Sequence, residues 1–235
     1  MRNPWAMPFE RPPYVVLDDE PRISKLNCST NENCRIDDGL LPEPFIGGFD
    51  RGTVALLNLN PSWHADDSAA HGRKSFREAV LRNLWHKQSE YPFYPLHLDF
   101  GTTPAGRWYR AHLRMLMETL SQRHGLKAHH IAQRLCVIEW FPYHSKHSNA
   151  PAERWSSQQY GFHFARNAVR LEKLVIVMRS AHLWRDIDWE DADVTRIRWM
   201  KCRSRRPWIT PENIGETLFC EILNALANDK SGAPN

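Results

Sequence analysis

Hydrophobic residues along the chain form short continuous runs separated by amphipathic stretches. One run opens residues 53–63, a second spans residues 135–141 and a third spans residues 174–178. Runs of Val, Ala, Leu and Ile with little polar alternation are typical of strands buried on both faces of a parallel sheet. Residues 194–201 do alternate, so we expect a fourth, less buried strand there.

Helical periodicity fills the stretches between these runs. Apolar residues three and four positions apart predict helices over 73–87, from 103 to 125, over 151–171, from about 180, and from 210 to about 228. Two of them begin with Thr-Pro, at Thr103 and Thr210, where threonine can cap free N–H groups and proline fits the first turn. Strands alternating with helices predict an α/β domain whose parallel sheet is covered on both faces.

Proline residues are concentrated in residues 1–50, where we expect no regular helix and at most a short edge strand at 14–17. The aromatic residues of this segment indicate a wrap pinned onto the domain surface. No linker divides residues 53–228, so we predict three regions: an N-terminal wrap over 1–50, one α/β domain over 51–228 and a disordered tail over 229–235.

Composition places the chain among globular proteins, with 42% hydrophobic and 25% charged residues. The net charge of +4 favours an anionic partner only weakly. The 5 cysteines have neither a disulfide framework nor a zinc-ligand spacing, so we expect free thiols in the cytoplasm, no metal and no cofactor. No apolar run is long enough to span a membrane.

Polar and aromatic residues follow three of the four expected strands. They are Asn60-Pro61-Ser62-Trp63-His64, then Glu139-Trp140-Phe141-Pro142-Tyr143-His144, then the segment around Ser204-Arg205-Arg206. Because the carboxyl ends of parallel strands share one edge, these clusters should surround one crevice. Such a mixture of amides, carboxylates, indoles and guanidinium groups suits a flat heterocycle next to a phosphate.

Each candidate has a structural alternative. Asn60-Pro61 is also what a strand-ending turn requires, and His182 fits a helix surface as well as the crevice. Glu139 is harder to explain structurally, because a buried carboxylate needs a partner, although an arginine would serve. The basic stretch from Arg196 to Arg206 fits a solvated strand face or a phosphate-contacting surface equally well.

Taken together, these clusters resemble the uracil-DNA glycosylase superfamily, and within it the poorly characterised bacterial branches. Leu57-Asn58-Leu59-Asn60-Pro61-Ser62 matches the Asn-Pro form of its first motif, with Asn58 in place of glycine. Glu139-Trp140-Phe141-Pro142 occupies the place of its second motif, with glutamate instead of asparagine. Ser204-Arg205-Arg206-Pro207 keeps its late loop loosely, and the resemblance covers about residues 50–225.

The resemblance implies a three-layer α/β/α sandwich around a four-stranded, mainly parallel sheet. It implies that the protein hydrolyses the N-glycosidic bond of a damaged or modified base in DNA. Asn60 would orient water, Glu139 would act as base or edge reader, and Trp63 or Trp140 would stack on the base. The implied base pocket also includes Asn58, Ser62, His64 and His182, and the phosphate contacts are Ser204, Arg205 and Arg206.

Two other functions fit the same residues. One is a non-catalytic module that binds nucleic acid or a nucleotide on this fold, and the other is an enzyme acting on free nucleosides or nucleotides. The expected partner is therefore DNA or a nucleotide, and the oligomeric state stays open.

Overall fold

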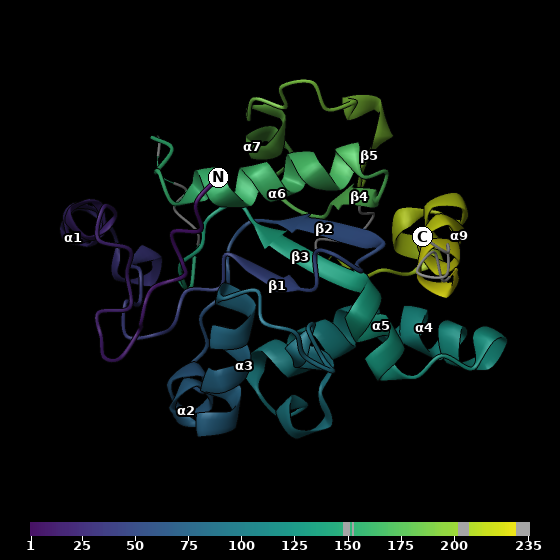
Figure 1. Ribbon diagram of the computed structural model, residues 1–235, viewed down its shortest axis with the longest axis horizontal. Helices are drawn as coiled ribbons and strands as arrows, with labels where there is room; N and C mark the ends of the chain where they lie inside the picture. The colour runs from purple at the N-terminus through teal and green to yellow at the C-terminus, as the bar shows by residue number, and fades with distance from the viewer. Residues whose placement is uncertain (148–150, 152, 202–206, 229–235) are drawn as a thin grey trace.

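The computed structural model describes residues 1–147, 151, 153–201 and 207–228, and its centre is a five-stranded sheet (Figure 1). The strand order is β1-β3-β2-β4-β5. The strands are β1 (Phe45–Gly47), β2 (Val54–Asn58), β3 (Leu135–Glu139), β4 (Leu174–Val177) and β5 (Ile197–Trp199). β2 pairs in parallel with β3 and β4, β4 pairs in parallel with β5, and β1 runs antiparallel to β3. The expected α/β class is confirmed, with the four expected strands and one more.

The additional strand, β1, lies in the segment that we expected to be an irregular wrap. Phe45 and Ile46 are buried, and they pair with Ile138 and Val137 of β3. At Gly47 the backbone has φ +112°, and a Cβ atom there would lie 2.4 Å from the carbonyl oxygen of Leu135. Only glycine tolerates both conditions, so Gly47 allows β1 to close against β3.

The central strands are buried along their whole length, as their continuous apolar runs predict. Every residue of β2 and of β3 is buried. The parallel register sets Val54 beside Leu135 and, at the other end, Asn58 beside Glu139. Two polar side chains therefore meet at the carboxyl edge of a sheet whose interior is otherwise apolar.

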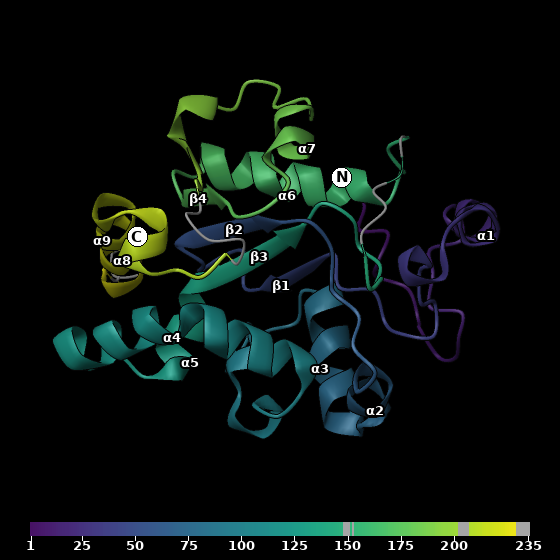
Figure 2. The same cartoon turned by 180° about the vertical axis from the view of Figure 1, so that it is seen from behind.

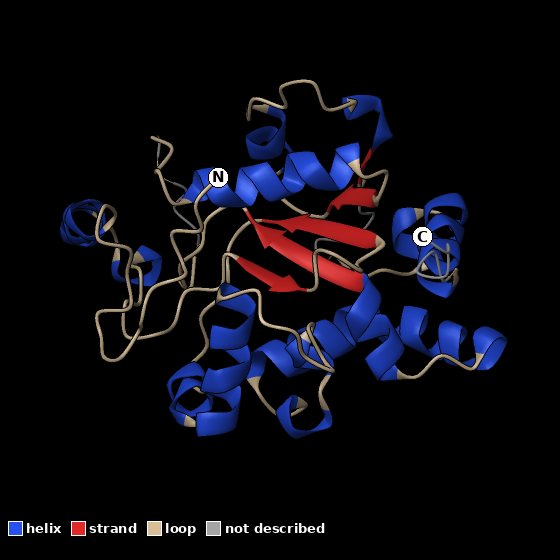
Figure 3. Cartoon of the chain, in the orientation of Figure 1, coloured by secondary structure: helices blue, strands red, loops and turns tan. Residues whose placement is uncertain are grey.

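Helices cover both sides of the sheet (Figures 1 and 2). α6 and α7 lie on one side, while α3, α4 and α5 lie on the other. Figure 3 shows the same division by secondary structure. The helices of the described residues are α1 (Glu20–Ser29), α2 (Asp67–Gly72), α3 (Lys74–Leu84), α4 (Pro104–His124), α5 (Ala128–Arg134), α6 (Gln158–Arg170), α7 (Ala181–Arg185), α8 (Pro211–Ile214) and α9 (Glu216–Ala227).

The predicted helix ends are confirmed for α4. The Thr103 side chain accepts a hydrogen bond from the N–H of Gly106 at 3.1 Å, and the helix stops at Gly125, which has φ +64°. The helix expected from residue 210 is instead two helices. α8 begins after its cap Thr210, and Gly215, with φ +91°, separates α8 from α9.

Two expectations for the N-terminal segment were wrong. Residues 20–29 form the helix α1, because Pro21 lies in the first turn, where proline is tolerated. Residues 14–17 pair with no strand; the N–H of Val16 donates to the Tyr143 hydroxyl at 3.1 Å. The expected anchoring by aromatic residues is present, since Trp5 and Phe9 are buried. Among the described helices, none has both the length and the apolarity required to cross a bilayer.

Candidate functional site

The candidate site begins with two side chains at the carboxyl ends of β2 and β3. Asn58 and Glu139 are only 5% and 4% exposed, and Asn58 Nδ2 donates to Glu139 Oε1 at 3.1 Å. The carbonyl oxygen of Asn58 accepts a further hydrogen bond from Trp184 Nε1 at 2.7 Å. Parallel pairing and this indole together hold the amide and the carboxyl group in a fixed relative position.

This pair leaves two oxygen atoms without a hydrogen-bond partner. Asn58 Oδ1 and Glu139 Oε2 are both buried, and no group among the described residues bonds to either. Burial raises the pKa of Glu139 to about 8, although the hydrogen bond from Asn58 opposes the rise. The carboxyl group is therefore mostly protonated at neutral pH, so it can donate a hydrogen bond while Asn58 Oδ1 accepts one. Since an unmet buried polar atom costs roughly 1–3 kcal/mol, such a pair marks a place where a ligand or water completes the bonding.

Both side chains line a cavity of about 40 Å³. One water molecule needs roughly 10–15 Å³ measured in this way, so the cavity holds a few waters and is smaller than a nucleobase. Pro104, Ala105 and Trp108, at the start of α4, form part of its wall, and the exposed residue Arg179 also lines it. The cavity thus joins the sheet edge to the first turns of α4.

Asn60 lines the same cavity and is held by its own amide N–H groups. Its Nδ2 donates to the carbonyl oxygen of Pro61 at 2.8 Å and to Ser145 Oγ at 3.1 Å. Among the described residues no group donates to Asn60 Oδ1, which is left to accept a hydrogen bond from water. Asn60 therefore both closes the turn after β2 and presents an oriented acceptor.

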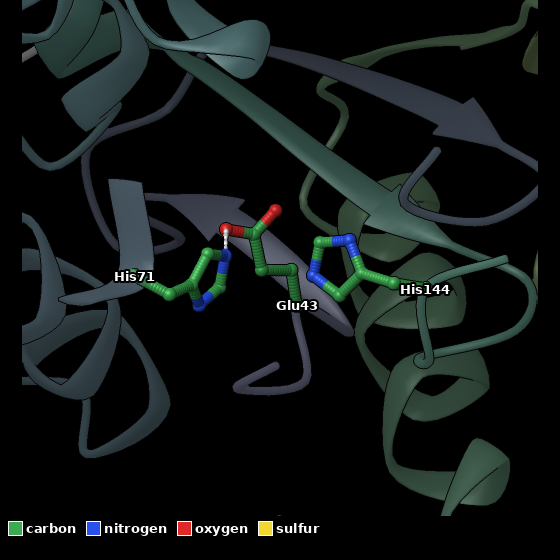
Figure 4. A group of neighbouring side chains, drawn as sticks. All are labelled: Glu43, His71 and His144. Atoms are coloured by element: carbon green, nitrogen blue, oxygen red, sulfur yellow. Dashed lines mark ion pairs between the residues drawn. The ribbon is translucent and has the colours of Figure 1, made fainter. Parts of the chain in front are cut away.

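A second polar cluster adjoins the first and consists of Glu43, His71 and His144 (Figure 4). The two nitrogens of His144 lie 2.8 Å and 3.1 Å from the carbonyl oxygens of Ser62 and Leu41. Carbonyl oxygens only accept hydrogen bonds, so the ring can only donate to them. Burial raises the pKa of Glu43, and the neighbouring His144 ring opposes part of this rise.

These three side chains meet the distance requirement for a metal site but are already engaged. Their candidate ligand atoms all lie within 4.8 Å of one another. His71 Nδ1 accepts from the N–H of Leu41 at 3.2 Å, so His71 Nε2 carries the hydrogen and lies 3.9 Å from Glu43 Oε1. Glu43 Oε1 also accepts from the Tyr94 hydroxyl at 2.5 Å. A metal would need free lone pairs on the imidazole rings, but His71 Nδ1 already accepts from Leu41 and both His144 nitrogens face carbonyl oxygens.

Four of the predicted base-binding residues lie away from the cavity. Trp63 Nε1 donates to Asp37 Oδ2 at 2.7 Å. Trp140 is buried against Phe162. His64 and His182 are exposed, the latter on α7. The aromatic rings that do line the cavity belong to Phe76, Trp108 and Tyr109.

The remaining predicted residues divide into two groups. Asn58, Asn60, Ser62 and Glu139 line one cavity, so residues 81 positions apart in the chain meet as expected. The predicted phosphate contacts Ser204, Arg205 and Arg206 lie outside the described residues, as does the predicted tail at 229–235.

Sequence reasoning missed several residues of the site. Glu43 interrupts an apolar stretch between Leu40 and Ile46, which is the same signal that identified Glu139. Asp67 and His71 lie on α2, and residues 64–72 have no apolar stripe that would predict this helix. Nothing in the local sequence distinguishes Trp108 from the other tryptophans.

Comparisons of the chain with family models, with curated proteins and with solved structures find no match. The geometry and chemistry of the cavity are therefore the basis for a function.

Proposed function

We propose that this cavity is the active site of a hydrolase that cleaves the N-glycosidic bond of a damaged or modified base in DNA. The resemblance to uracil-DNA glycosylases motivates the proposal, and the pair Asn58–Glu139 carries it. The pair presents one buried acceptor and one buried donor, both unmet, at the carboxyl edge of a mainly parallel sheet, where ligands of α/β proteins bind. Their spacing along a single edge suits the donor and acceptor atoms of a base.

The reaction forms a bond between water oxygen and the sugar C1′ and breaks the bond from C1′ to the base nitrogen. Asn60 Oδ1 accepts a hydrogen bond from the water and directs its oxygen at C1′. The electron pair of the broken bond leaves with the base, where Glu139 in its protonated form donates a hydrogen bond or its proton. Asn58 Oδ1 accepts a hydrogen bond from an N–H of the base, and the attacking water releases its proton to solvent.

Entry of a base requires the cavity to widen. Its volume of about 40 Å³ is below that of a nucleobase, so the wall at Pro104, Ala105 and Trp108 must move outward. Extruding a base from a duplex costs a few kcal/mol, and stacking on Trp108 or Tyr109 would offset part of that cost. Arg179, exposed beside the cavity, supplies positive charge for a backbone phosphate.

The test is release of free base, followed by chromatography, from duplexes that carry uracil, hypoxanthine or a mismatched base. We expect Asn60→Ala to reduce the single-turnover rate by roughly 100-fold, because water loses its positioning group. Asn224→Ala, at an exposed position on α9, serves as the control and should leave the rate unchanged. Folded protein that releases no base from any duplex of the panel contradicts the proposal.

The small cavity favours a second candidate, a non-catalytic module that binds nucleic acid or a nucleotide. In that case the protein binds DNA with an affinity that falls as salt rises, no base is released, and Asn60→Ala leaves the affinity intact. Fluorescence anisotropy with a labelled duplex, at two or more salt concentrations, separates this candidate from the enzyme. Arg179→Ala should weaken binding and reduce the salt dependence in both cases.

A further inference from the structure

A larger hollow lies at the opposite end of the central strands. Its volume is about 310 Å³, within the range of small-molecule sites. It is lined by the loop from Gly47 to Arg51, which joins β1 to β2, by the end of α3 and by Gln133 next to the start of β3. The candidate active site is at the carboxyl ends of β2 and β3, so the two cavities are separated by the length of the sheet.

One wall of this hollow is aromatic. The rings of Phe49 and Phe164 are stacked, with centroids 4.3 Å apart, and both residues are half-buried. His86 completes the wall with φ +51°, a left-handed conformation that costs energy for any residue with a side chain. Its ring stacks on Phe45 at 4.9 Å, and its Nε2 lies 2.9 Å from the Tyr160 hydroxyl. These contacts hold a flat surface in place beside the cavity.

The rim of the hollow is positively charged. Arg51, Arg82 and Lys87 are exposed, and none has a carboxylate within 4.0 Å among the described residues. Asp50 is the only acidic residue of the described chain that lines this hollow. Three cations thus face one carboxylate, and the excess charge is not neutralised by the protein.

A neighbouring hollow of about 800 Å³ provides a contrast. It shares Arg51 with the first, but its other arginines include Arg196 and Arg198, which bond to Glu172 at 2.9 Å and to Glu221 at 2.8 Å. Those charges are already balanced by carboxylates. The cations without a carboxylate partner lie instead in the first hollow, beside the stacked rings of Phe49 and Phe164. Positive charge next to aromatic rings favours a ligand that is both flat and anionic.

We propose that the hollow beside Phe49 and Phe164 binds a mononucleotide. The base packs against the two phenylalanine rings and His86, where its apolar faces leave water. The phosphate lies against Arg51, Arg82 and Lys87, whose excess charge matches a dianion. This site is independent of the proposed hydrolase function, because it shares no lining residue with the cavity of Asn58 and Glu139.

Isothermal titration calorimetry with adenosine 5′-monophosphate, adenosine and inorganic phosphate tests the proposal. The monophosphate should bind more tightly than either fragment. The double variant Arg51→Gln/Arg82→Gln should lower the affinity for the monophosphate at least 10-fold and leave the affinity for adenosine unchanged. Phe164→Leu should lower the affinity for both ligands that contain a base and leave the affinity for phosphate unchanged. Arg114→Gln/Arg123→Gln, at exposed positions on α4, removes the same charge elsewhere and should have no effect.

Several outcomes would overturn the proposal. They are no binding of any probe at millimolar concentration, equal affinity for phosphate and the monophosphate, or insensitivity to the Arg51 and Arg82 changes. A thymidine tetranucleotide that displaces the monophosphate and binds far more tightly would instead assign the hollow to a single strand. Asn60→Ala should keep full affinity for the monophosphate, so failure of the hydrolase proposal leaves this result unaffected.

Discussion

Two polar clusters adjoin the same small cavity, yet their hydrogen bonding differs completely. In the cluster of Glu43, His71 and His144, both nitrogens of His144 lie within hydrogen-bond distance of carbonyl oxygens, and Glu43 accepts a hydrogen bond from the Tyr94 hydroxyl. In the pair of Asn58 and Glu139, one hydrogen bond joins the side chains and one oxygen of each is left without a partner. Both groups are buried, so solvent does not explain the difference.

This contrast distinguishes buried polar groups that stabilise the fold from buried polar groups that are available to a ligand. The first cluster stabilises the loops that it joins, because Glu43 and the His71 and His144 rings each have a hydrogen-bond partner inside the protein. Each buried oxygen without a hydrogen bond lowers the stability of the protein, and a ligand that bonds to it recovers that free energy. Substitutions in the cluster of Glu43, His71 and His144 should therefore change mainly the stability of the protein. Substitutions in the pair of Asn58 and Glu139 should change mainly its activity.

The largest expected effect is that of His144→Ala on stability. The substitution removes a buried aromatic ring and takes away the side-chain partner of the Leu41 and Ser62 carbonyl oxygens. A cavity of this size together with unmet buried acceptors costs about 3–5 kcal/mol. Urea denaturation of both proteins at neutral pH measures the loss.

His147→Ala is the matched control for this experiment. His147 is exposed, so its truncation should change the free energy of unfolding by less than about 0.5 kcal/mol. If His144→Ala lowered the free energy of unfolding no more than His147→Ala does, the His144 ring would not hold together the segments of Leu41 and Ser62.

The second effect concerns the pH dependence of stability through Glu139. Burial raises the pKa of this carboxyl group from 4.5 to about 8, so its favourable contribution is complete below pH 4.5 and is lost as pH rises through 8. Glutamine has a similar shape and cannot ionise. Relative to wild type, Glu139→Gln should therefore gain stability with rising pH, by about 2 kcal/mol between pH 6 and pH 8.

The comparison must be made as a difference between the two proteins. Burial also raises the pKa values of Glu43 and Asp67, so wild type loses stability with pH for more than one reason. Denaturation midpoints of both proteins, at several pH values, isolate the share of Glu139. Parallel curves would show that this carboxyl group titrates normally. In the base-release assay the same variant should lose activity, because it cannot supply a proton.

Elements that depend on the local sequence pattern could be predicted, whereas those that depend on contacts between distant segments could not. The central strands were predicted because continuous apolar runs, each ended by polar or proline residues, report burial on both faces. Glu139 was predicted as a candidate because a carboxylate in such a run is costly without a function or a partner. Its register with Asn58 follows from parallel pairing, which the alternation of strands and helices also predicts.

The parts that were missed depend on contacts between distant segments. β1 has only two buried apolar residues, Phe45 and Ile46, and it becomes a strand by pairing with β3. His144 was predicted only as part of the polar segment after the second strand, and its position is determined by the carbonyl oxygens of Leu41 and Ser62. No local pattern shows which indole faces a cavity, which is why Trp63 was chosen and Trp108 was not.

The smallest expected effect concerns the N-terminal cap of α4. Thr103 caps this helix, and the turns that follow contain Pro104 and Trp108, which line the cavity. Thr103→Ala should destabilise the protein by about 1 kcal/mol, because the N–H of Gly106 loses its acceptor. Amide hydrogen exchange should accelerate over residues 105–108 and not at His144, since the cap supports the cavity wall and not the cluster of Glu43, His71 and His144. Thr102→Ala, one residue earlier and exposed, should change neither measurement, and equal effects of the two substitutions would contradict the capping role.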